Sequence, residues 1–257
     1  MDRGAGKDRR DLMNTVTIVI PVYNEGGNIV QTMQAIANAL PERNYSVSVI
    51  YDSPDDTTLP PLDRVIPDLP FPVRKIQNRY GRGALNAIKT GMETAETEYV
   101  IVTMADLSDP PEVIQSMISE AETNQADIVC GSRYMKGGAQ YGGPWLKGLM
   151  SRTAGLLLHY LAGLPTHDPT NSFKLYRKSF LDQMTIESTG GFEIGIELVV
   201  KAWKNGYKVS QVPTTWRDRS DGESHFKLFG WLSSYLRWFF AAFTMKRKTN
   251  QGRGNAG

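Results

Sequence analysis

A short run of apolar, mostly β-branched residues, Tyr99–Val102, constrains the fold of this chain more than any other feature. Such a run is typical of a strand that is buried on both faces, as in a parallel sheet covered by helices. The run leads to Asp106 and Ser108, and Asp109 with Pro110 then predicts a helix start, as N-cap and first helical residue. A carboxylate between a strand end and a helix start lies where open α/β sheets bind their ligands.

Asp106 and Ser108 both carry hard oxygen atoms. Mg²⁺ and Mn²⁺ prefer such ligands, so the two residues form a candidate metal site. The same pattern fits a second interpretation, in which Asp106 is only a turn or cap residue. This stretch by itself leaves both interpretations open.

Strand-like and helix-like segments alternate through the first half of the chain. Strands are predicted at 15–22, 45–51, 73–77 and 127–130, and helices at 28–40, 84–91 and 111–123. This alternation predicts an α/β fold, with a mostly parallel sheet and helices on both faces. The second strand ends on Asp52, which is therefore expected to face the same cleft as Asp106. Four prolines between residues 57 and 70 predict that any helix there is broken.

The second half of the chain is less regular. Glycines at 136–143 predict a mobile loop, and helices are predicted at 145–164 and 192–205, the latter with Glu193 and Glu197 on one face. A polar turn at 167–172 leads into a short strand, and a strand at 207–212 precedes a basic loop at 214–227. The single cysteine, Cys130, lies in an apolar run, which favours a buried strand residue over a nucleophile.

Charge and the N-terminal residues narrow the classes of function. The chain has 29 Lys and Arg against 27 Asp and Glu, so its net charge of +2 gives no reason to expect nucleic acid as a partner. Residues 1–13 are expected to form a disordered arm, and they lack the apolar stretch of a signal peptide. No uncharged apolar run is long enough to predict a transmembrane helix, so the expected location is cytoplasmic.

The segment 226–248 is rich in aromatic residues and ends on the basic residues Lys246, Arg247 and Lys248. It is too short for a membrane span, and Arg237 lies near its middle. This pattern predicts an amphipathic helix lying in a membrane interface. The alternative is an ordinary core or dimer-packing helix. Residues 249–257 are expected to form a disordered tail, which leaves 14–225 as the main domain.

Eight short motifs follow one another in a specific order. They occupy residues 20–25, 51–53, 81–84, 105–108, 131–134, 151–152, 168–177 and 222–224, the last followed by Lys227. With these motifs the chain resembles the family 2 glycosyltransferases, whose fold is the Rossmann-like GT-A fold. Within that family it is most similar to the dolichyl-phosphate (polyprenyl-phosphate) mannosyltransferase branch. The resemblance covers roughly residues 14–230.

The resemblance implies inverting transfer of a hexose, with mannose favoured, from a nucleotide-sugar, with GDP-mannose favoured. The implied acceptor is a dolichyl or polyprenyl phosphate at a membrane surface. The implied cofactor is Mg²⁺ or Mn²⁺, with Asp106 and Ser108 as its ligands. The resemblance also implies a peripheral protein at the cytoplasmic face of the membrane, and it allows a separate membrane subunit as a partner.

The functional residues of the family carry over to matching positions of this chain. The expected catalytic residues are Asp106, Arg133 and Asp168. The expected donor-binding residues are Pro21, Tyr23, Asn24, Glu25, Asp52, Gly81, Gly83, Ala84, Ala105 and Asp106. The expected acceptor phosphate-binding residues are Arg133, Arg152, Ser172, Arg219 and Lys227.

General chemistry agrees with this assignment. A diphosphate leaving group needs its charge neutralised by a metal and by cationic side chains, and the planar fork of arginine suits phosphate oxygens. A phosphate monoester is already largely ionised near neutral pH, so no strong general base is expected. Asp168 is the best candidate for a base, and the alternative is a turn residue before Pro169.

Two positions depart from the family pattern. Met104 stands where the metal motif usually has its first aspartate, and Tyr51 replaces the first of two aspartates after the second strand. The expected consequences are weaker metal affinity, an altered base or sugar preference, or loss of activity. Two other functions therefore stay open: a non-catalytic nucleotide-sugar- or lipid-phosphate-binding subunit of a glycosylation complex, and a soluble glycosyltransferase acting on a sugar hydroxyl.

Overall fold

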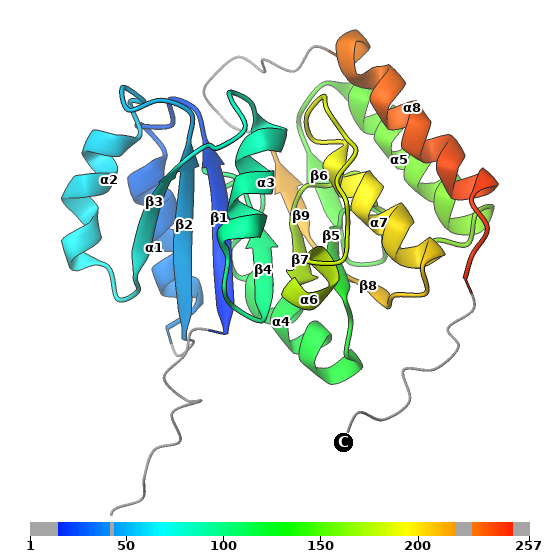
Figure 1. Ribbon diagram of the computed structural model, residues 1–257, viewed down its shortest axis with the longest axis horizontal. Coiled ribbons are helices and arrows are strands. Elements are labelled where there is room, and N and C mark those ends of the chain that lie inside the picture. Colours follow the sequence, from blue (N-terminus) through cyan, green and yellow to red (C-terminus); the bar gives the residue numbers. More distant parts are fainter. Residues whose placement is uncertain (1–14, 42–43, 219–227, 249–257) are drawn as a thin grey trace, which may run out of the picture.

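A seven-stranded sheet forms the centre of the molecule (Figure 1). The computed structural model describes residues 15–41, 44–218 and 228–248. Along the sheet the strands lie in the order β3-β2-β1-β4-β7-β5-β8, and only β7 runs antiparallel to its neighbours. The strands are β1 (Val16–Val22), β2 (Tyr45–Tyr51), β3 (Val73–Gln77), β4 (Tyr99–Val102), β5 (Ile128–Ser132), β7 (Lys174–Arg177) and β8 (Val209–Pro213). The predicted mostly parallel α/β sheet is confirmed.

Helices cover both faces of this sheet. They are α1 (Ile29–Ala39), α2 (Leu59–Val65), the 3₁₀ helix η2 (Ile66–Asp68), α3 (Ala84–Thr94), α4 (Val113–Asn124), α5 (Trp145–Tyr160), α6 (Lys178–Leu181), α7 (Ile194–Lys204) and α8 (Leu228–Thr244). Side chains of β1 alternate between two apolar clusters: Ile18 belongs to the cluster that includes residues of α1, α2 and α4, and Val19 to the one that includes residues of α3, α5, α7 and α8. The strands are therefore buried on both sides, which explains their nearly continuous apolar sequences.

The prolines between 57 and 70 do not have the predicted effect. Pro60 and Pro61 occupy the first turn of α2, where a backbone N–H has no helical partner to lose. Pro67 likewise lies in the first turn of η2, directly after α2. The prediction that any helix here is broken was wrong for α2, because prolines at a helix start are tolerated.

The start of α4 also differs from the prediction. Pro110 and Pro111 form a turn whose carbonyls accept the N–H groups of Val113 and Ile114 at 3.1 and 3.0 Å, and α4 begins at Val113. Asp109 is not the N-cap, and its buried carboxylate instead accepts a hydrogen bond from Asn171. Asp109 therefore makes a tertiary hydrogen bond to Asn171 instead of capping the helix as the local sequence pattern predicts.

A second, two-stranded sheet lies beside the carboxyl edge of the first. The strands β6 (Ala139–Tyr141) and β9 (Thr215–Arg217) pair in parallel. The glycine-rich stretch 136–143 is therefore not the mobile loop that its composition predicts. The β6–β9 pair continues the pairing of β5 with β8, because Thr214 donates its N–H to the carbonyl of Ser132 at 3.1 Å and accepts the N–H of Ala139 at 3.0 Å.

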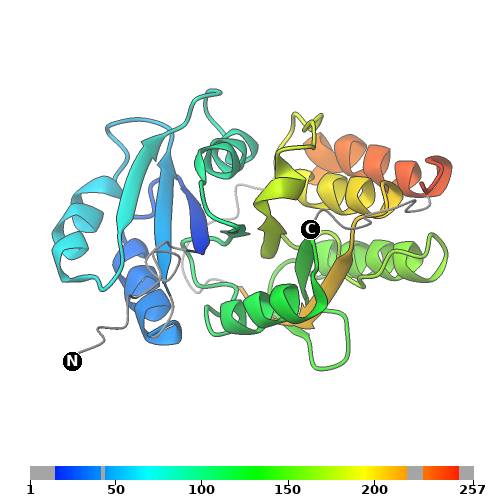
Figure 2. The same cartoon turned by 60° about the horizontal axis from the view of Figure 1, so that its bottom comes forward.

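The C-terminal helix α8 packs against α7 and α5, and Figures 1 and 2 both show it on the side of the molecule opposite α1 and α2. Its inner side is fixed by Trp238, which is buried and donates to Ser188 Oγ at 3.0 Å. Among the helices that the structure describes, none combines the length and apolar character that crossing a bilayer demands. The expected arm at 1–13 and tail at 249–257 lie outside the described residues.

Helices α5 and α8 expose an unusual number of large apolar side chains. We call this set the α5–α8 apolar surface; it consists of Trp145, Leu146, Leu149, Leu157, Tyr160 and Leu161 from α5 and its end, and Leu236, Phe240 and Phe243 from α8. Trp145 is 76% exposed and Phe240 58%. Helix α8 is therefore both a packing helix, through Trp238, and a surface helix, through its opposite face.

Candidate active site

The carboxyl ends of β1, β2 and β4 meet at one edge of the sheet. Val22 of β1 pairs with Tyr51, the last residue of β2, and Val19 of β1 pairs with Val102, the last residue of β4. Because these strands are parallel, the loops that carry Asp52 and Asp106 leave the sheet at the same edge, as the sequence pattern predicts.

The loop after β1 is held by the loop after β2. Asn24 has a left-handed φ of 57°, and its backbone N–H donates to both carboxylate oxygens of Asp56, at 3.1 and 3.2 Å. The next N–H, from Glu25, donates to Thr58 Oγ1 at 2.9 Å. This clamp leaves Tyr23 exposed at the sheet edge. Sequence reasoning found Tyr23, Asn24 and Glu25 but missed Asp56 and Thr58, whose only signal is the polar run after the second strand.

Asp52 organises the turn that precedes α3. Its Oδ2 accepts the N–H of Gly83 at 3.0 Å, and its Oδ1 accepts Asn78 Nδ2 at 2.8 Å. Asn78 Nδ2 also donates to the carbonyl of Gly81 at 2.7 Å. Gly83 has a φ of 125°, which favours glycine, and Ala84 then begins α3. The structure thus brings together four of the residues predicted to bind the donor.

The turn that carries Asp106 is strained and fixed on both sides. Leu107 adopts a left-handed φ of 55°, which is unfavourable for a bulky side chain. Asp106 Oδ1 accepts the N–H of Ser108 at 3.1 Å, and the carbonyl of Ser108 accepts the N–H of Arg217 at 2.9 Å. The carbonyl of Ala105 accepts a threonine hydroxyl of α1 at 2.6 Å. Pro21, a further predicted donor residue, lies buried within β1.

Asp106 and Ser108 are the two residues that the sequence predicts as metal ligands. The described residues contain no group of three or more His, Cys, Asp or Glu side chains that could enclose a metal ion. Asp106 is half-buried at the sheet edge, whereas Ser108 is buried. Mg²⁺ is commonly bound by one or two carboxylates, with substrate phosphates and water completing its shell. The residues fit such a shared ion, held by Asp106 and the substrate, and do not fit an ion enclosed by protein.

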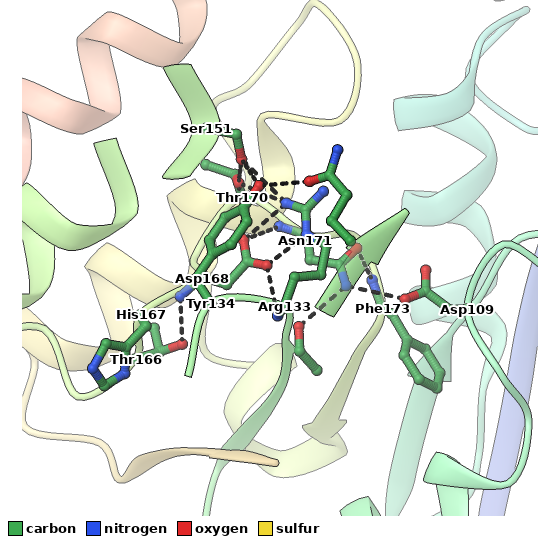
Figure 3. A network of polar contacts seen from close by, with 12 residues as sticks. Asp109, Arg133, Tyr134, Ser151, Thr166, His167, Asp168, Thr170, Asn171 and Phe173 are labelled. Atoms are coloured by element: carbon green, nitrogen blue, oxygen red, sulfur yellow. Dashed lines mark hydrogen bonds and ion pairs between the residues drawn. The ribbon is translucent and has the colours of Figure 1, made fainter. Parts of the chain in front are cut away.

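Arg133 and Asp168 form a buried ion pair on the other half of the edge (Figure 3). Arg133 Nε and Nη2 donate to the two carboxylate oxygens at 2.7 and 3.0 Å, and the backbone N–H of Arg133 adds a third bond at 3.1 Å. The Asp168 side chain is fully buried. Burial alone would raise the pKa of this carboxyl, but the charge and hydrogen bonds of Arg133 outweigh it and hold the pKa below its ordinary value.

Hydroxyl groups complete the surroundings of the pair. Asp168 Oδ1 also accepts the Thr170 hydroxyl at 3.0 Å and the N–H of Asn171 at 3.2 Å. Arg133 Nη2 reaches Ser151 Oγ of α5 at 3.1 Å. Asp168 is therefore ionised but engaged on both oxygens, which is a poor arrangement for a general base. Its geometry is that of a counter-ion that orients Arg133, and its bonds to Thr170 and Asn171 also make it a turn residue, as the alternative from the sequence has it.

Helix α5 carries two further cationic side chains near Arg133. Lys147 precedes Ser151 by one helical turn, and burial together with the Arg133 charge lowers its pKa. Arg152 is exposed, and its charge acts on the Tyr134 phenol beside Arg133. Sequence reasoning identified Arg152 but missed Lys147, although the four-residue spacing to Ser151 was visible. Ser172 is half-buried in the loop after Asp168, and Arg219 and Lys227 lie outside the described residues.

Three other titratable residues belong to the scaffold. Cys130 is buried in β5, and burial raises the pKa of its thiol to about 11, which confirms the structural interpretation. Glu197 is buried and accepts the N–H groups of Glu187 and Ser188 at 2.6 and 2.8 Å, so it fixes the loop before α7. Glu193 is also buried, and it accepts a backbone N–H from that same loop.

The fold is that of the GT-A nucleotide-sugar transferases. A solved structure of glucosyl-3-phosphoglycerate synthase from Mycobacterium tuberculosis with Mn²⁺, UDP and glucosyl-3-phosphoglycerate has a TM-score of 0.66, at 15% identity. The similarity covers 89% of this chain and 80% of that one. Another structure of that enzyme, with Mg²⁺ and UDP, has a TM-score of 0.62 at 16% identity, covering 90% and 78%. At these identities the likeness establishes the fold alone.

The chain belongs to glycosyl transferase family 2, whose model matches residues 17–185. It is 33% identical over 216 residues to a dolichol-phosphate mannosyltransferase from Pyrococcus furiosus, which covers 82% of this chain and 59% of the relative. It is 29% identical over 232 residues to a polyprenol monophosphomannose synthase from Mycolicibacterium smegmatis, with 87% and 86% covered. The chain thus spans about three fifths of the length of the archaeal relative.

Proposed function

We propose that this chain is a glycosyltransferase that transfers a hexose, with mannose favoured, from a nucleotide-sugar, with GDP-mannose favoured, to a polyprenyl or dolichyl phosphate. One observation carries the proposal. Helix α5 bears Lys147, Ser151 and Arg152 beside Arg133, and the same helix contributes five members of the α5–α8 apolar surface. A cationic cluster next to exposed apolar side chains suits a ligand with a phosphate head and a hydrocarbon tail. The names of the two relatives agree with such an acceptor.

The reaction needs alignment and charge neutralisation more than proton transfer. An acceptor phosphate oxygen attacks the anomeric carbon, the bond from that carbon to the diphosphate breaks, and the configuration inverts. Arg133 is suited to hold the acceptor, because Asp168 engages its Nε and Nη2 while no described residue accepts a hydrogen bond from Nη1. A bound Mg²⁺ or Mn²⁺ would neutralise the departing diphosphate, and Asp106 is the residue that would hold it.

The hydrogen bonds that Asp168 accepts are also relevant to the alternative function, a soluble glycosyltransferase that acts on a sugar hydroxyl. Transfer to a sugar hydroxyl requires a general base to remove the proton. The candidate, Asp168, is fully buried and accepts hydrogen bonds on both oxygens. An acceptor that is already an anion does not need that base, so the geometry favours the phosphate acceptor.

The α5–α8 apolar surface is proposed to lie in a membrane interface, with the protein peripheral at the cytoplasmic face. Its aromatic members, such as Trp145, Tyr160 and Phe240, are the residue types that enter the headgroup region. Basic residues Lys246, Arg247 and Lys248 lie just beyond α8, after Met245, and would attract anionic lipids.

The test is transfer of radiolabelled mannose from GDP-mannose to a short polyprenyl phosphate in detergent with Mn²⁺. Wild type, Asp106→Ala and Arg133→Lys are compared, with Tyr45→Phe, on the opposite edge of the sheet, as the control. The expected result is a lipid-linked product that is strongly reduced in both site variants and retained in the control. Product that persists in Asp106→Ala would remove the proposed metal ligand. Absence of product from wild type with both GDP- and UDP-sugars would overturn the proposed function.

A further inference from the structure

Asn171 lies between the two halves of the candidate active site (Figure 3). Its side-chain Nδ2 donates to Asp109 Oδ1 at 3.2 Å and to the carbonyl of Gly131 at 3.1 Å. Its backbone N–H donates to Asp168 Oδ1 at 3.2 Å. One residue therefore contacts the loop that carries Asp106, the end of β5 and the counter-ion of Arg133.

Each of these contacts is close to a group that faces a substrate. Asp109 follows Asp106 by three residues, in the loop that Leu107 holds in a left-handed conformation. Gly131 precedes Arg133 by two residues. A displacement of Asn171 would consequently act on the donor side through Asp109 and on the acceptor side through Gly131 and Asp168.

Burial makes this connection rigid. Asp109 is 3% exposed and Asn171 5%. If one of the two side chains were removed, the other could not form a hydrogen bond to bulk water in its place. Breaking a buried hydrogen bond leaves a polar group unsatisfied, which is more costly than losing an exposed bond. The Asn171 side-chain oxygen is also engaged, since it accepts the N–H of Phe173 at 3.4 Å. The amide is thereby fixed in the orientation that points Nδ2 at Asp109.

We propose that Asn171 is a positioning residue that sets the separation between the Asp106 loop and Arg133, through hydrogen bonds to Asp109, Gly131 and Asp168. The proposal rests on the proposed function, in which Asp106 faces the donor diphosphate and Arg133 the acceptor phosphate. In-line transfer depends on the alignment of these two groups, and a misplacement of about 1 Å can reduce a rate by about 100-fold. The binding of each substrate depends on it much less.

The kinetic test compares Asn171→Ala, Asp109→Ala and the double variant in the mannose-transfer assay. Each single variant is expected to lower kcat by about 10- to 100-fold, with both KM values within about threefold of wild type. Because the two residues act through one contact, the double variant is expected to lose little more than the more impaired single variant. Asp109→Asn keeps an acceptor oxygen for Asn171 and is expected to lose less than Asp109→Ala.

Tyr45→Phe is the matched control, because it removes another buried hydrogen bond, from the Tyr45 hydroxyl to the carbonyl of Ile36, far from the site. Its kcat is expected to stay within about twofold of wild type, even where its thermal midpoint falls as much as that of Asn171→Ala. Fully additive losses in the double variant would overturn the proposal. A loss confined to KM, or an equal fall of kcat in Tyr45→Phe, would overturn it as well.

An activity-independent measurement separates this proposal from the proposed function. The Nε–H signal of Arg133 can be observed by NMR and assigned by its loss in Arg133→Lys. Asn171→Ala and Asp109→Ala are both expected to shift or broaden this signal, whereas Tyr45→Phe leaves it unchanged. An unchanged Arg133 signal in both Asn171→Ala and Asp109→Ala would overturn the positioning role of Asn171. Absence of mannose transfer by wild type would overturn the proposed function without affecting this result.

Discussion

Replacing Asp168 with asparagine tests the claim that this residue serves as the counter-ion of Arg133. The substitution keeps the size of the side chain but removes the charge, so Arg133, whose side chain is only 12% exposed, is left as a buried and uncompensated cation. Removing one partner of a buried ion pair typically costs about 3–5 kcal/mol. The amide would also present an N–H₂ group to donors that now have a carboxylate, so we expect a loss at the upper part of that range.

Urea denaturation of wild type, Asp168→Asn and the double variant Arg133→Met/Asp168→Asn measures this effect. The double variant is expected to regain a substantial part of the lost free energy of unfolding, because it no longer buries an unpaired charge. A loss below about 1 kcal/mol in Asp168→Asn, or no recovery in the double variant, would refute the reasoning.

The stability that this ion pair contributes depends on pH, and the lowered pKa of Asp168 sets the direction of that dependence. The pKa of Asp168 in the folded protein lies below that of the unfolded chain, which is about 3.9. Its contribution to stability is thus fully present above that unfolded value and is lost as the pH falls through the lower folded value. Wild type is expected to show this acid-induced loss, and Asp168→Asn is expected to lack it.

Three further outcomes follow from the structure. Met104→Asp, which adds a carboxylate beside the Asp106 turn, is expected to lower the Mn²⁺ concentration needed for half-maximal transfer by about tenfold; an unchanged metal titration would contradict a metal at Asp106. Cys130, with a pKa near 11, is expected to resist alkylation at pH 8 until the protein unfolds, and labelling of the native protein at the rate of the unfolded chain would contradict its burial. Tyr160→Ser/Phe240→Ser is expected to reduce flotation with anionic liposomes by at least about tenfold, whereas Tyr80→Ser, an exposed aromatic outside the α5–α8 apolar surface, leaves flotation unchanged.

The sequence predicted the geometry of the side that we assign to the donor better than that of the side that we assign to the acceptor, for a physical reason. In β1, β2 and β4 the apolar runs and the polar turns after them are local signals, and parallel pairing brings their ends together without further information. Asp52, Gly83 and Ala84 therefore appear where the pattern places them. The resemblance to a family then supplied the substrates that we propose, which no spacing of residues could give.

The features that were missed depend on contacts between distant parts of the chain. Asp109 looks like a helix cap because it precedes two prolines, yet Asn171, 62 residues later, takes its carboxylate. Asp168 looks like a base or a turn residue until its contact with Arg133, 35 positions away, is known. Residues 136–143 look mobile because of their glycines, yet Ala139–Tyr141 pair with β9, 76 positions further along the chain. Local propensity cannot encode such partners.

The antiparallel strand β7 also bears on how the molecule assembles during synthesis. Strand β4 pairs with β1 and strand β5 with β8, but β4 and β5 do not pair with each other, so Lys174–Arg177 of β7 alone joins these two parts of the sheet. Until those residues have left the ribosome, β4 presents the bare edge of a wholly apolar strand, which is a template for aggregation. The late insertion of four residues therefore closes the sheet, and a nascent chain that stalls before them would depend on chaperones to remain soluble.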